Sequence, residues 1–117
     1  MIKHDLFPTL VTEFHNPEHE AFKKVFFERF HLHCNENGQS NENTAHNDIH
    51  QDPHFNPLFQ FVFKSLSEHL KEVGLDPDFQ QIYLVKSWLM ITRKWHVPVH
   101  NHADAHISFV YYVKTPE

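Results

Sequence analysis

The chain has 117 residues, of which 40% are hydrophobic and 12 are phenylalanine, so one domain with a substantial core is expected. Its net charge of −5 argues against a dedicated nucleic-acid binder, and no stretch approaches the roughly 20 apolar residues that cross a membrane. Cys34 is the only cysteine, which excludes an intrachain disulfide and favours a reducing compartment, the cytoplasm.

The first half of the chain predicts a strand followed by two helices. Residues 6–14 alternate weakly, which indicates an N-terminal strand with Pro8 at its start or on a sheet edge. Asn16 and Pro17 are typical of a helix start, and this helix should end near residues 35–38. Residues 38–52 are polar and predict a long surface loop. A second helix should begin near residue 52 or 56 and end at Gly74.

Both helices carry an apolar stripe at helical spacing, and we expect the second stripe to be buried against a sheet. The stripes consist of Phe22, Val25, Phe26 and Phe30 in the first helix, and of Leu58, Phe61, Val62, Leu66, Leu70 and Val73 in the second.

The second half predicts three strands, over residues 81–93, 96–102 and 107–114, and Trp88 is expected to anchor the core. The order strand, helix, loop, helix and three strands indicates an α+β fold in a single domain spanning 1–117. Four strands cannot close a barrel or complete a sandwich, and the last strand would expose an edge. We therefore expect this chain to be the N-terminal part of a longer protein.

His100-Asn101-His102 is the stretch that points most directly to chemistry. In an extended segment the side chains of His100 and His102 lie on one face, because successive side chains alternate. Two imidazoles so placed form a partial site for Fe, Zn, Cu or Ni. Asp104 could add a carboxylate or could simply cap a turn. The chain has 13 histidines, so close pairs also arise by chance.

Several segments in sequence order resemble a family of iron- and 2-oxoglutarate-dependent oxygenases. Its members carry a tryptophan strand, a short turn, an H-x-H-P-like element and an S-G-V-Y-Y-like strand. The matching residues here are 87–89, Lys94, 98–104 and 107–113, and residues 6–11 and 40–41 also resemble the family's opening strand and a Ser-Asn pair of its polar loop. The turn at Trp95-His96 departs from the family's Gly-Asp turn.

The resemblance implies a double-stranded β-helix (jelly-roll) core on which the helices pack, with Fe(II) in a facial triad and 2-oxoglutarate as co-substrate. His100 matches the first histidine of the metal motif, and His102 stands where most relatives have Asp or Glu. The family's distal histidine and its 2-oxoglutarate-binding arginine follow the strand that ends here at Val113, and this chain has no counterpart of either. The resemblance thus implies an incomplete site, which we expect to bind metal weakly and not to turn over 2-oxoglutarate alone. The substrate, a small molecule or a peptide, is not indicated.

Two alternatives stay open. A cupin-like metal protein would use an H-x-H pair with a third ligand near His106, although Lys94 stands where the cupin motif has glycine. A non-catalytic binding module would instead use an exposed sheet edge, or would contribute half of a site to a homo-oligomer.

Overall fold

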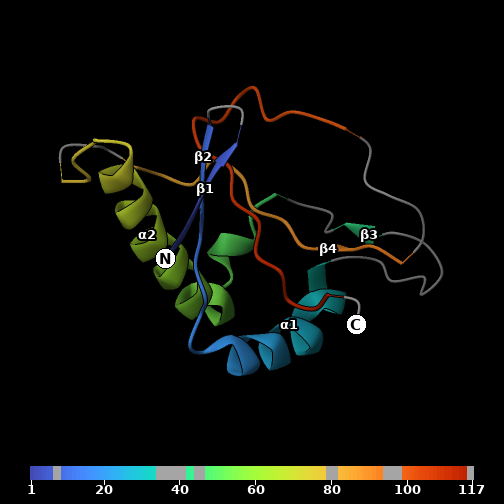
Figure 1. Cartoon of the computed structure of the whole chain (residues 1–117). Coiled ribbons are helices and arrows are strands. Elements are labelled where there is room, and N and C mark those ends of the chain that lie inside the picture. The colour runs from blue at the N-terminus through green and yellow to red at the C-terminus, as the bar shows by residue number, and fades with distance from the viewer. Residues whose placement is uncertain (7–8, 34–41, 44–46, 79–81, 94–98, 116–117) are drawn as a thin grey trace.

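The structure, a computed structural model, describes residues 1–6, 9–33, 42–43, 47–78, 82–93 and 99–115 (Figure 1). These residues form a small mixed α/β structure with two α-helices and two short antiparallel pairs of strands. Within these residues no helix has both the length and the apolar character needed to cross a membrane.

The N-terminal strand is confirmed, and a strand that the sequence pattern did not indicate pairs with it. Strand β2 (Thr9–Glu13) forms an antiparallel hairpin with β1 (Ile2–Leu6), in a register that places His4 opposite Val11. The predicted edge residue Pro8 lies outside the described residues. Thr12 Oγ1 is 2.8 Å from His69 Nδ1, and an ion pair joins Lys3 to Glu72, so the hairpin is held against the end of helix α2.

Helix α1 (His19–His33) begins two residues after Pro17, the predicted first helical position, because residues 17–18 form a turn. The Asn16 side chain accepts a hydrogen bond of 2.9 Å from the backbone N–H of Glu18, which satisfies a donor that the first turn would otherwise leave unpaired. Phe22, Phe26 and Phe30 recur every four residues and are all buried. Their spacing places them on one face, which explains why this helix packs as the pattern predicts.

Helix α2 (Asn56–Glu72) ends at the predicted glycine, since Gly74 has a φ of +83° and its N–H donates to the Lys71 carbonyl. The predicted stripe is partly wrong. Phe59 is buried, whereas Phe61 is only half-buried and Val73 is exposed. The reason is that the stripe faces helix α1 and the short 3-10 helix Pro53–Phe55 rather than a sheet, which turns the buried face toward Phe59.

The core is formed by side chains of the two helices and of segments far away from them in sequence. It comprises the buried residues Phe22, Phe26, Phe30, Ile49, Phe55, Leu58, Phe59, Val62 and Leu89, with Val25, Leu84, Ile91, Tyr111 and Val113 packed against them. Ile49 corrects one expectation, because the end of the predicted surface loop contributes a buried side chain to this core.

The predicted strands of the second half are largely absent from the described residues. Among residues 82–93 only β4 (Met90–Ile91) is a strand, paired with β3 (Glu42–Asn43), and residues 99–115 contain none. The start of the strand predicted over 96–102 lies outside the described residues. β-Branched and aromatic residues form a strand only when a neighbouring strand completes the ladder. Here these segments contact the helices through side chains instead, as when Tyr111 OH lies 2.8 Å from His19 Nδ1.

Candidate functional site

The side chains of His100 and His102 converge as predicted. Their Nε2 atoms are 3.2 Å apart, and the two rings meet edge to face with centroids 4.9 Å apart. Both residues lie on an irregular segment at the protein surface. The expected proximity is therefore confirmed, and metal ligation remains a prediction.

A neighbouring segment fixes the position of His102. The Trp88 ring packs on the His102 ring, with centroids 5.7 Å apart, and Lys86 Nζ pairs with Asp104 Oδ2 at 2.8 Å. A turn adds a third restraint, because Ala105 N–H donates to the His102 carbonyl at 3.0 Å. Trp88 is thus not the core anchor that the sequence suggested, since it is partly exposed and supports the histidine pair.

A third metal ligand does not stand beside this pair in the described part of the chain. No group of three His, Cys, Asp or Glu side chains there is arranged to hold a metal ion. The hydrogen bond and the charge of Lys86 lower the pKa of the Asp104 carboxyl, which keeps it as an ionised partner of Lys86. His106, the candidate of the cupin-like reading, is exposed, and Cys34 lies outside the described residues.

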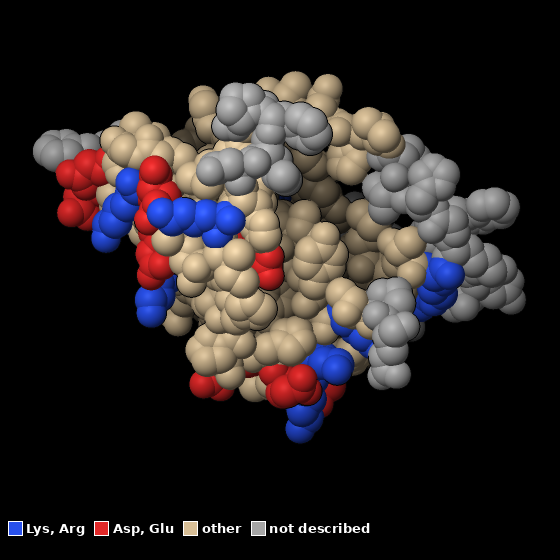
Figure 2. All heavy atoms as spheres, in the orientation of Figure 1, with Lys and Arg blue, Asp and Glu red and all other residues tan. Residues whose placement is uncertain are grey.

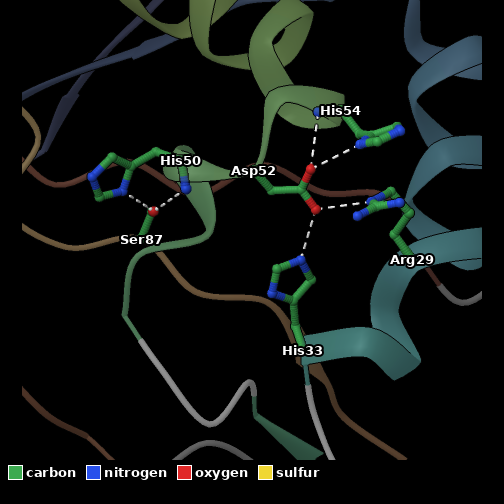
Figure 3. Close-up of polar contacts among 6 residues, drawn as sticks. All are labelled: Arg29, His33, His50, Asp52, His54 and Ser87. Carbon is green, nitrogen blue, oxygen red and sulfur yellow. Dashed lines mark hydrogen bonds and ion pairs between the residues drawn. The ribbon is translucent and has the colours of Figure 1, made fainter.

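A second polar cluster, centred on Asp52, was missed by sequence reasoning (Figure 3). Asp52 Oδ2 accepts hydrogen bonds from Arg29 Nε at 2.8 Å and from His33 Nε2 at 2.9 Å. Asp52 Oδ1 accepts from the backbone N–H and from Nδ1 of His54, each at 3.0 Å. The cluster joins helix α1 to the turn that precedes α2.

The environment of Asp52 favours its charged form. Burial by itself would raise the pKa of this carboxyl, but the hydrogen bonds from His33, His54 and Arg29 outweigh burial and hold the pKa well below its usual range. The carboxylate already accepts hydrogen bonds from four donors of its own chain. We therefore interpret the cluster as a structural contact between α1 and the turn before α2 rather than as a site for a ligand.

A third polar contact joins His50 to Ser87 (Figure 3). The buried Ser87 Oγ accepts from the His50 backbone N–H at 3.0 Å and lies 2.5 Å from His50 Nδ1. The Ser87 hydroxyl can accept from the backbone N–H and donate to Nδ1 at the same time. His50 also lines an open hollow of about 420 Å³ together with Asn56, Phe59, Gln60, Phe63 and residues 82–84. The lining does not include the His100–His102 pair.

Charged side chains do not gather as a field of one sign on the face seen in Figure 2. Acidic and basic groups lie together at its left and lower edges, basic groups lie at its right edge, and mostly uncharged side chains lie between them. Comparison with models of protein families, with curated proteins and with solved structures finds no match. The functional argument therefore depends on the site itself.

Proposed function

We propose that this chain supplies His100 and His102 as two metal ligands of an Fe(II)- and 2-oxoglutarate-dependent oxygenase with a jelly-roll core. The observation that carries the proposal is the distance of 3.2 Å between the two Nε2 atoms. Two nitrogens that each lie about 2.1 Å from one ion are about 3.0 Å apart at an octahedral angle and about 3.4 Å apart at a tetrahedral angle. The observed separation lies between these values, which supports the proposal that both nitrogens bind one ion.

The protonation of the pair is compatible with this role. At 3.2 Å one Nε2–H can donate to the lone pair of the other Nε2. An ion needs both lone pairs, and the donating ring can move its proton to Nδ1 without becoming charged. When bound, Fe(II) and 2-oxoglutarate supply the oxidation of a C–H bond by molecular oxygen. The chain contributes the position of the ligands, through the contacts of Trp88 and the turn at Ala105.

The choice of an oxygenase among metal proteins is supported by the order of the segments around the pair. The tryptophan segment at 87–89, the H-x-H element and the aromatic segment 107–113 follow one another as in that family. The usual iron site of such enzymes combines two histidines with one carboxylate and leaves open positions for the co-substrate. The pair formed by His100 and His102 accounts for the nitrogen part of that set.

Trp88 provides a local reporter with which to test the proposal, because its ring lies 5.7 Å from that of His102. We would replace Trp95 with Phe, so that Trp88 alone fluoresces, and titrate Fe(II) without oxygen. We expect saturable quenching that His100→Ala and His102→Ala each weaken at least tenfold. The matched control His106→Ala should bind as the parent does, and a loss in this variant would favour the cupin-like reading instead.

The co-substrate gives a second, independent readout. 2-Oxoglutarate that chelates the bound ion must tighten Fe(II) binding, because the two affinities are linked. We expect at least a tenfold gain in apparent Fe(II) affinity at saturating 2-oxoglutarate, and none with succinate. Unchanged Fe(II) affinity would refute the oxygenase assignment, and Fe(II) binding that ignores both histidines would refute the site.

A non-catalytic binding module is the second candidate, and the segment 107–113 favours it. Val110 and Tyr112 are 73% and 70% exposed, and this segment has no partner strand among the described residues. An extended, apolar segment of this kind is suited to pairing with a strand of another chain. This reading requires no metal, so the same Fe(II) titration separates it from the first candidate.

A further inference from the structure

The ion pair of Lys86 and Asp104 is the nearest charged feature to the histidine pair. Lys86 and Trp88 are two residues apart on one segment, and His102 and Asp104 are two residues apart on the other. Lys86 contacts Asp104 and Trp88 contacts His102, so the two segments run antiparallel and the four side chains share one surface. The carboxylate therefore lies on the same surface as the candidate metal ligands, although it is paired with Lys86.

The ion pair between Lys86 and Asp104 can be broken at little cost in stability. Its two side chains are 50% and 56% exposed, and an ion pair in such a position contributes little stability because water solvates both partners. The turn closed by Ala105 N–H and the His102 carbonyl folds Asp104 back toward His102. Transfer of the Asp104 carboxylate from Lys86 to an ion held by the histidines would move exposed side chains and would leave the core unchanged.

We propose that Asp104 is an exchangeable third metal ligand, which Lys86 holds away from the site until His100 and His102 bind a divalent ion. This inference rests on the proposed function, since it needs the histidines as ligands. It completes the set of two histidines and one carboxylate from a single stretch of the chain. Lys86 sets the affinity of the site, because the carboxylate must leave the ammonium group before it reaches the ion.

The test is a double-mutant cycle measured with Co(II), whose binding is followed by quenching of Trp88 in the Trp95→Phe background. Asp104→Asn keeps the size of the side chain and should weaken binding at least tenfold. Lys86→Met releases the carboxylate and should tighten binding at least fivefold. In the Asp104→Asn background, Lys86→Met should change the affinity less than twofold, because no carboxylate remains to be released. Lys24→Met, which removes a lysine from the exposed pair with Glu28, is the matched control and should have no effect.

The other outcomes show whether the role of Asp104 alone is wrong or whether the proposed function is wrong as well. Equal tightening by Lys86→Met with and without Asp104 would show that only the local charge acts, and would overturn the role of Asp104. Co(II) binding that depends on His100 and His102 but is unchanged in Asp104→Asn would also overturn it, while the histidine site itself would stand. Binding that is indifferent to both histidines would overturn the proposed function, and the inference with it. Circular dichroism of each variant confirms that the helices are intact.

Discussion

Replacing Asp52 with Asn should lower the free energy of unfolding by about 2–4 kcal/mol, although the change alters one atom. The carboxylate is 7% exposed and accepts four hydrogen bonds of 2.8–3.0 Å, two of them from Arg29 and His33 on helix α1. Removing one partner of a buried ion pair costs about 3–5 kcal/mol. We expect a smaller cost because Arg29 and His33 keep 26% and 24% of their side-chain surface exposed, so water replaces part of the lost interaction. The amide oxygen of Asn can still accept from the backbone N–H of His54.

Urea unfolding followed by circular dichroism measures this difference. Asp76→Asn is the matched control, since Asp76 also accepts from a backbone N–H two residues ahead, that of Asp78 at 2.9 Å, but in an exposed turn. It should change stability by less than about 0.5 kcal/mol. If the Asp52 variant unfolds at the same urea concentration as the Asp76 variant, the cluster does not join α1 to α2 in solution and our reasoning is wrong.

Three further changes test other parts of the structure. The pKa of Asp52 is lowered from 3.8, so the advantage of the wild type over Asp52→Asn should hold from neutral pH down to about 3.8 and shrink below it, as urea midpoints at successive pH values would show. Phe55→Ala removes a side chain with no exposed surface and should cost about 3–5 kcal/mol in urea unfolding, whereas Phe27→Ala, at a half-exposed position of α1, should cost far less. Ser87→Ala leaves the His50 backbone N–H without its acceptor and should cost about 1–3 kcal/mol in the same assay, more than Ser67→Ala at an exposed hydrogen bond.

The elements that could be predicted from sequence are those whose stability is local. The two helices follow from apolar spacing together with Asn16 at one start and Gly74 at one end, and each signal lies within a few residues of its effect. The strands expected over 81–93 and 107–114 depended on partners elsewhere in the chain. The β-branched and aromatic residues of these segments favour a β-sheet, but they do not show whether a neighbouring strand is present.

The same distinction applies to the sites. His100 and His102 are two positions apart in the chain, so the sequence alone could predict that their side chains converge. In the Asp52 cluster the contact with His54 is local, but Arg29 and His33 reach Asp52 only after α1 has packed on the turn that precedes α2. A partial signal was available, because Arg29 and His33 are four residues apart on one helix face, and Asp52 before Pro53 is typical of a helix cap. Neither signal says that the two features face each other.

The segment 84–91 links the helical core to the candidate metal site through an alternation of its side chains. Ser87 and Leu89 are buried, and they bind the His50 backbone and the phenylalanine core respectively. Lys86 and Trp88 point to the opposite side, where they contact Asp104 and His102. Because adjacent residues of an extended segment face opposite ways, anchoring Ser87 and Leu89 in the core also fixes where Lys86 and Trp88 emerge. The helices thereby help to determine the position of the histidine pair through this segment, and the affinity of the site for metal should depend on residues of the core as well as on its ligands.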